Sequence, residues 1–187
     1  MSKDKNDVLM GAGEFYMSEF TGDKIPDHAT IEVPENNVGH TSGGASFEYT
    51  PETYEIVNSY GKTVKKFITK EECTFKTGLL TWAIENISLL STAKVTEDKE
   101  KKVKKVTFGT GGALKNILIR FVHTKENGKK LRLTMIANSG NGFTMEFSGE
   151  KETIIDAEFT AISYIDNFLA EFEEELTDEE AAAVKSK

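Results

Sequence analysis

The chain of 187 residues is poor in the residue types on which many small functional sites depend, with one cysteine, one tryptophan, three histidines and three prolines. A single cysteine excludes an internal disulfide framework and a cysteine-rich zinc site. No apolar run approaches the roughly 18 residues of a membrane-spanning helix. The opening residues MSKDKNDVLMGAG contain no apolar segment typical of a signal peptide, so we expect the protein to stay where it is made.

The remaining composition is that of a globular β protein. Hydrophobic residues make up 38% of the chain and charged residues 29%, which is typical of a folded domain. Twelve phenylalanines and five tyrosines lie along alternating runs and favour sheets over helices. The sequence therefore predicts one mainly β domain over residues 1–176, followed by a flexible tail over residues 177–187.

The net charge of −8 conceals three blocks of different sign. Residues 1–60 carry 11 acidic and 3 basic side chains, residues 61–135 carry 7 and 17, and residues 136–187 carry 13 and 3. A basic middle between acidic ends can place opposite charges on opposite flanks, which suits head-to-tail contacts between copies. Ordinary solvated surface charge explains the pattern equally well.

Period-2 patterning is the main structural signal. Short apolar stretches predict a first strand around residues 15–17 and a hairpin over residues 117–136, in which the sequence ENGK indicates a type I′ turn. Both faces of that hairpin are apolar, so we expect the core to cover one face and a neighbouring molecule the other. A second, half-buried hairpin is predicted over residues 155–172.

Two further segments have distinct patterns. Residues 21–39 contain two prolines and only one short apolar alternation, which predicts a long ordered loop or arm outside the core. An apolar stripe at Leu80, Ala83, Ile87 and Leu90 predicts one helix of about three turns, capped by Thr81. The lysine-rich residues 95–105 predict a mobile hairpin tip or loop.

The segment from residue 40 to residue 92 carries the clearest likeness to a known family. A Gly-Gly pair precedes the alternating strand ASFEY, the sequence TPETYEIV follows, and a strand through TKEECTFKTGL leads to LTW and a helix. This order resembles the opening of phage tail tube proteins. The sequences ETIIDAEFTAIS and DNFLAEFEEEL are similar to the closing strands of the same subunits.

The resemblance implies a tail-tube-like fold, a single-domain β-sandwich or barrel of two antiparallel sheets with one flanking α-helix and a long loop. It also implies hexameric rings that stack head to tail into a hollow tube, the conduit for double-stranded DNA and tape-measure protein during genome delivery. The implied partners are other copies of the chain and the tape-measure, tail terminator and baseplate or tip proteins. The implied location is the virion tail, assembled in the bacterial host cytoplasm.

Three groups of candidate residues follow. The loop expected to join rings contains Ile25, Pro26, Ile31, Val33, Pro34, Asn36 and Asn37. The strand positions expected to face the tube lumen are Ser46, Glu48, Thr74 and Lys76. The positions expected to pack the core or the helix are Phe47, Tyr49, Phe75, Trp82, Ile87, Leu90 and Phe159.

The sequence offers little for catalysis, and we expect no enzyme activity, cofactor or metal. The glycine-rich residues 11–13 and 109–115 each miss a glycine that nucleotide-binding loops need. The histidines are far apart in sequence, and acidic pairs such as Glu71 and Glu72 are best explained as solvated. The alternative function is a small β-sandwich module that binds a ligand, such as a carbohydrate or adhesin-like domain, and does not form tubes.

Overall fold

The fold is known from a computed structural model, which describes residues 13–109, 111–177 and 181. Strands dominate it, as the alternating sequence predicts. In chain order the elements are β1 (Glu14–Glu19), α1 (His28–Ile31), the 3-10 helix η1 (Pro34–Asn36), β2 (Thr41–Val57), β3 (Thr63–Leu79), α2 (Ile84–Leu89), β4 (Lys94–Asp98), β5 (Val103–Thr107), β6 (Ile117–Thr124), β7 (Lys130–Asn138), β8 (Phe143–Met145), β9 (Ile155–Ala161) and β10 (Ala170–Glu174).

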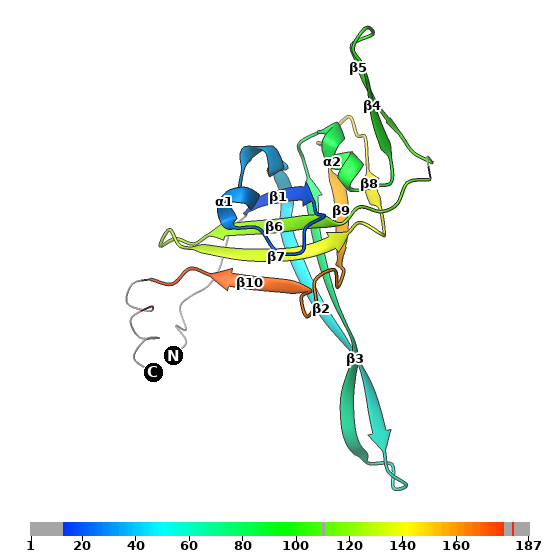
Figure 1. Ribbon diagram of the computed structural model, residues 1–187, viewed down its shortest axis with the longest axis vertical. Helices are drawn as coiled ribbons and strands as arrows, with labels where there is room; N and C mark the ends of the chain where they lie inside the picture. The colour runs from blue at the N-terminus through cyan, green and yellow to red at the C-terminus, as the bar shows by residue number, and fades with distance from the viewer. Residues whose placement is uncertain (1–12, 110, 178–180, 182–187) are drawn as a thin grey trace.

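One large antiparallel sheet folds into two layers that pack face to face. Its strand order is β1-β6-β7-β9-β3-β2, with β10 also paired to β7 and β8 to β9. Figure 1 shows β1, β6, β7 and β10 crossing β2, β3 and β9 at a steep angle. The small sheet of β4 and β5 stands apart from this body. The predicted fold class, a mainly β sandwich with a flanking helix, is confirmed.

Aromatic side chains fill the space between the two layers. The ring of Phe15 on β1 stacks on Phe75 of β3 with centroids 5.2 Å apart, and it meets Phe159 of β9 edge-on at 5.7 Å. All three are almost completely buried. Burial of one such ring stabilises the fold by roughly 1.5–3 kcal/mol. Because Phe15 belongs to one layer and Phe75 and Phe159 belong to the other, their contacts hold the two layers together.

A second apolar cluster lies on the opposite face of β6 and β7. Leu118, Val122 and Ile136 pack there against Phe20 and Ile31. The expectation that a neighbouring molecule covers this face is therefore wrong, because segments of the same chain cover it. The expectation that residues 21–39 stay outside the core is also wrong, since Ile31 is buried.

Two predicted turns differ from the structure. Gly128 has φ of 79° while Asn127 does not have positive φ, so the β6–β7 connection is not type I′. The bonds from Gly128 N to Lys125 O and from Lys125 N to Lys129 O instead fit a type I turn that ends in a glycine bulge. The predicted hairpin over residues 155–172 does not form, because β9 pairs with β3 and β10 pairs with β7.

The predicted helix is shorter than its apolar stripe. α2 covers only Ile84–Leu89, with Ala83 as its N-cap. Thr81 does not cap it, because the Thr81 hydroxyl accepts a hydrogen bond from His40 N at 2.8 Å. The tail predicted over residues 177–187 lies almost wholly outside the described residues.

Candidate assembly surface

The most exposed feature of the fold is the outer half of the β2–β3 hairpin, residues 53–68, which we call the arm. The inner half of β3 also pairs with β9, whereas residues of the arm pair only with one another. A register shift between Glu52 and Thr53 marks the boundary between the two halves. Beyond it the arm projects away from the sandwich and twists (Figure 1).

The arm carries apolar side chains that the described part of the chain leaves uncovered. Tyr60 at its tip is 87% exposed and Tyr54 is 62% exposed. The full set of large exposed apolar residues on the arm is Tyr54, Ile56, Val57, Tyr60, Val64, Phe67 and Ile68. An isolated two-stranded hairpin is marginally stable in water, and clustered exposed apolar residues mark contact sites. The arm therefore has the properties of an interaction element.

Polar interactions on the arm order its side chains without covering them. Tyr54 and Phe67 are direct cross-strand partners, so they share one face of the arm. The Lys65 ammonium lies 4.6 Å from the centre of the Phe67 ring, and Glu55 pairs with Lys66 at 2.8 Å. The arm carries three lysines and one glutamate, so it is basic as well as apolar.

The four positions predicted to face a lumen share one face of the inner hairpin. Ser46 pairs with Lys76 and Glu48 with Thr74 across the two strands. Phe47 and Phe75 lie between them and point to the core, so the four predicted positions point away from it. Ser46, Glu48 and Lys76 are exposed, whereas Thr74 is nearly buried. Their role in lining a channel remains a prediction.

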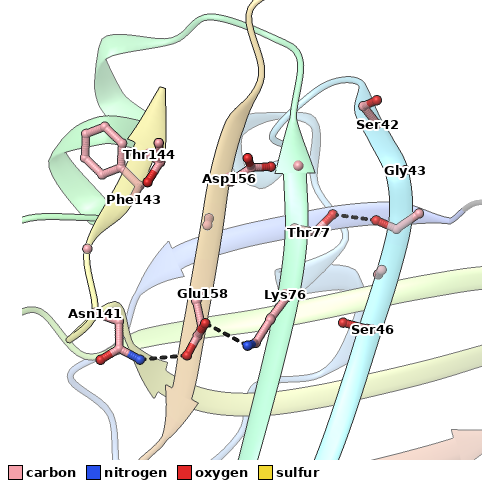
Figure 2. A pocket seen from close by; sticks show the side chains of 15 residues that line it. Ser42, Gly43, Ser46, Lys76, Thr77, Asn141, Phe143, Thr144, Asp156 and Glu158 are labelled. Carbon is pink, nitrogen blue, oxygen red and sulfur yellow. Dashed lines mark hydrogen bonds and ion pairs between the residues drawn. The ribbon is translucent and has the colours of Figure 1, made fainter. Parts of the chain in front are cut away.

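A shallow hollow of about 500 Å³ lies on this same face. Figure 2 shows Lys76 Nζ reaching Glu158 across the strands, at 2.9 Å, and Asn141 Nδ2 donating to the same carboxylate at 2.6 Å. The hydrogen bond from Lys76 holds the pKa of Glu158 below its ordinary value and raises the pKa of the lysine. Gly78 also lines the hollow, and an added Cβ there would lie 2.7 Å from Ile154 Cγ2.

The Gly43-Gly44 pair at the rim of this hollow lies within a strand and does not simply precede one. Both glycines lie inside β2 and have positive φ, 72° and 74°. The register between β2 and β3 shifts between Ser42 and Ala45. The pair is therefore a bulge in an edge strand, a conformation that glycine adopts without strain.

The segment predicted to join rings, residues 21–39, is folded against its own sandwich. α1 is capped by Asp27, whose side chain accepts from Thr30 N at 2.9 Å. Asn36 Nδ2 donates to Ile31 O at 3.0 Å, and Asn37 forms an isolated bridge with Tyr16. Of the seven residues predicted for this loop, Ile31 is buried and Ile25 packs on the second cluster; Pro34 is exposed, and Pro26, Val33, Asn36 and Asn37 are partly exposed.

A buried ionic cluster centred on Glu32 fastens this segment. Glu32 accepts from Arg132 Nε at 2.6 Å, from Lys130 Nζ at 3.1 Å and from Arg120 Nη1 at 3.2 Å. Arg120 also contacts His28 Nδ1 at 2.9 Å, and its Nε has no partner among the described residues. The cluster links α1 to β6 and β7 through groups that are mostly removed from water.

β10 completes the cluster from the other side. Arg132 Nη1 donates to Glu175 at 2.7 Å, and His28 Nε2 lies 3.0 Å from Glu173. Burial acts to raise the pKa of Glu32, but hydrogen bonds from Arg132 and Lys130 outweigh it and hold that pKa below its ordinary value. Burial lowers the pKa of Arg120. The arrangement is a structural clamp with the acid ionised.

The basic segment at residues 95–105 forms most of the β4–β5 hairpin. It projects from the end of the sandwich opposite the arm (Figure 1). Lys104 contacts Glu85 of α2 at 2.7 Å and Glu97 at 3.0 Å, and these hydrogen bonds raise the lysine pKa. The expectation of a hairpin is confirmed.

The residues predicted to pack the core divide into two groups. Phe75, Ile87, Leu90 and Phe159 are buried, and Phe47 is partly buried. The prediction is wrong for Tyr49 and Trp82, because these residues are 48% and 59% exposed. Trp82 precedes α2 and lies with Phe147 beside a small hollow at the end of the sandwich. Tyr49 donates to Glu71 at 2.6 Å instead of entering the core.

Sequence reasoning did not single out the arm or the Glu32 cluster. The run from Tyr54 to Ile68 does contain a visible signal, because apolar residues occupy both faces of two strands that flank the sequence NSYGK. The cluster had no such signal, since its members lie up to about 140 residues apart in the chain. Only the pairing of β6, β7 and β10 brings them together.

No model of a protein family matches this chain, and no curated protein matches it. Within residues 13–109, 111–177 and 181, no group of three or more histidine, cysteine, aspartate or glutamate side chains is placed to hold a metal ion. In the same part of the chain, no helix has the length and apolar character needed to cross a membrane.

Proposed function

We propose that this protein is a structural subunit of a phage tail tube. Copies assemble into hexameric rings, and the rings stack into a hollow tube through which DNA and the tape-measure protein pass. The proposal joins the likeness of residues 40–92 to tail tube proteins with the mainly β sandwich. The virion tail is then the site of action, and terminator and baseplate proteins are the partners at the two ends of the tube.

The arm is the observation that carries the proposal. Seven large apolar side chains on a projecting hairpin are uncovered in a single copy. Leaving them in water is unfavourable by roughly 25 cal/mol for each Å² of apolar surface that a partner would cover. A second copy of the chain provides that cover most directly, because a tube places identical neighbours at a fixed position beside every subunit.

In a ring the contact that the arm makes is heterologous. Two arms that met each other would form an isologous pair about a two-fold axis, whereas a ring requires the arm to contact a different surface of its neighbour. Contacts of this kind generate rings when the rotation closes and filaments when it does not. A tube of stacked rings needs one contact that closes each ring and another that repeats from ring to ring. A simple two-fold dimer needs neither.

The polar face of the inner hairpin is a suitable wall for a DNA channel. Acidic residues outnumber basic ones on that face, which carries Glu48, Glu52, Glu72, Asp156 and Glu158 against Lys70 and Lys76. An acidic wall repels the phosphate backbone and lets DNA slide without binding, because protein affinity for DNA comes largely from neutralising phosphates. The face therefore supports the assignment of Ser46, Glu48 and Lys76 to the lumen, whereas Thr74 lies on the same face but is buried.

The test is negative-stain electron microscopy of the purified protein over a concentration series, with light scattering for mass. We expect rings or hollow tubes of uniform width. The double variant Tyr54→Asp/Phe67→Asp should remain a folded monomer of about 20.8 kDa, because both side chains lie outside the core. The matched control Trp82→Asp is a change of similar size at an exposed position away from the arm.

The outcomes separate the tube from the alternative. Wild-type protein that remains monomeric at every concentration contradicts the proposal and favours a ligand-binding β-sandwich module. Wild-type rings that persist in the arm variant contradict the role of the arm but leave the tube in place. A circular dichroism spectrum of the variant that matches the wild type shows that loss of assembly does not come from unfolding.

A further inference from the structure

A groove with aromatic walls lies where the root of the β2–β3 hairpin meets β10. Phe47 and Tyr49 of β2 form one wall, and Phe168, Leu169 and Phe172 form the other. The hollow has a volume of about 590 Å³. Phe172 is 56% exposed although its ring meets Phe47 edge-on at 5.1 Å. The groove thus presents aromatic side chains to solvent on the core-facing side of the hairpin.

Two unpaired strand edges flank this groove. Among the described residues β10 pairs with β7 alone, and β2 pairs with β3 alone. Open edges of this kind attract further chains unless something covers them. An apolar floor between two open edges is a surface to which an extended, apolar segment of another molecule is well suited.

The charge of the groove matches one available occupant. Glu71 is the one charged residue that lines it, and this residue is exposed. The arm carries a net charge of +2, from three lysines and one glutamate. Apolar surface on both sides and opposite charges at the rim make the arm and the groove complementary.

The arm cannot reach the groove of its own molecule. Tyr49 in the groove wall and Val57 near the arm tip lie eight residues apart on one continuous strand, which spans about 26 Å at ~3.3 Å per residue. The strand runs outward over that distance (Figure 1). An arm that fills the groove must therefore come from a second copy.

From this arrangement we infer that the arm of one copy docks in the Phe172 groove of the next. The inference rests on the proposed function and deepens it, because it names the surface that receives the arm. Tyr54, Ile56 and Phe67 provide the apolar contacts, and Lys65 lies toward Glu71. Arm and groove are different surfaces, so each copy donates one arm and receives one, and the contact repeats around a ring.

Paired cysteines test the contact directly. The native thiol is first removed by Cys73→Ala, and this background is checked for wild-type assembly. Ile56→Cys on the arm is then combined with Ser163→Cys, an exposed position that lines the groove. Under mild oxidation we expect a ladder of disulfide-linked dimers, trimers and larger species on a non-reducing gel, while each single-cysteine variant forms dimers at most.

Two control pairs show whether the groove is the correct receiver. Ile56→Cys with Phe147→Cys probes the other exposed aromatic hollow, and Ile56→Cys with Val103→Cys probes the β4–β5 hairpin. If the protein assembles and a control pair gives the ladder, or if none of the pairs gives one, the groove is not the surface that receives the arm. The tube proposal then remains intact. Failure of the unmodified protein to assemble overturns both.

A substitution in the groove gives an independent measurement. Phe172→Asp should raise the concentration needed for assembly by about tenfold or more, the effect of removing a central aromatic anchor. Its melting temperature as a monomer should stay near that of the wild type, because over half of the ring is already exposed. Phe147→Asp is the matched control and should assemble like the wild type. An equal effect of both substitutions contradicts the inference.

Discussion

Replacing Glu32 by glutamine tests the ionic cluster that holds residues 21–39 against the sandwich. The substitution keeps the shape of the side chain and removes its charge. Arg132 retains Glu175 at 2.7 Å, but Arg120 retains only the contact with His28. Removing one partner of a buried ion pair costs about 3–5 kcal/mol because a charge is left unpaired out of water.

The lower end of that range applies here. Lys130 and Glu173 at the rim of the cluster are each 37% exposed on their side chains, so water screens part of the interaction. We expect Glu32→Gln to lower the free energy of unfolding by about 3 kcal/mol, or the melting temperature by about 6–12 °C for a chain of this size. Thermal and urea unfolding followed by circular dichroism measure the two quantities.

The pH dependence of this effect has a definite sign. Hydrogen bonds hold the pKa of Glu32 in the folded protein below its ordinary value of 4.5. The ionised acid therefore stabilises the fold above pH 4.5, and this contribution disappears as the pH falls through the folded pKa. The difference between wild type and Glu32→Gln should be complete at pH 7 and should shrink in acid.

An exposed acid three residues away provides the control. Glu35 has no partner among the described residues, so Glu35→Gln should change the free energy of unfolding by at most about 0.5 kcal/mol. If Glu32→Gln, Glu35→Gln and the wild type have the same free energy of unfolding at pH 7, the cluster does not stabilise the fold. A difference of constant size down to pH 3 would instead mean that ionisation of Glu32 is not its source.

Three further predictions concern the sandwich itself. Phe159→Ala should cost about 3–5 kcal/mol of unfolding free energy, whereas Trp82→Ala should cost less than about 1 kcal/mol because its ring is largely in water; chemical denaturation compares them. Gly39→Ala should lower the melting temperature measurably, because Gly39 has φ of 87° and an added Cβ would lie 2.2 Å from Thr81 Oγ1. Lys104→Gln should leave the melting temperature within experimental error, since exposed ion pairs contribute little; a large drop would show that the β4–β5 hairpin supports α2.

Alternation along the chain was sufficient to predict most strands. Phe75 and Phe159 were predicted to be buried because each occupies the apolar side of a half-buried strand, and this periodicity is local. Trp82 was misplaced for the opposite reason. Its predicted packing assumed a helix that begins before residue 82, whereas α2 begins at Ile84. Hydrogen bonding of Thr81 to His40, a residue distant in sequence, accompanies this later start.

Strand partners were not predictable from the same patterns. The alternation in β9 and β10 is clear, yet the two strands pair with β3 and β7 and not with each other. Likewise, both faces of β6 and β7 were recognised as apolar, but nothing in that pattern identifies Ile31 as one of the residues that cover them. Periodicity specifies which side of a strand is buried and carries no information on which element buries it.

The sequence alone determined the fold class, the identity of most strands and the scarcity of metal-binding and nucleophilic side chains, because these follow from composition and from a local repeat of two residues. Tertiary structure decided that residues 21–39 are clamped by Glu32, that the outer half of the β2–β3 hairpin lacks cover and that a groove opens beside Phe172. Each of these depends on contacts between segments far apart in the chain. Such contacts are set by how the two layers of the sheet cross, a property of the whole fold.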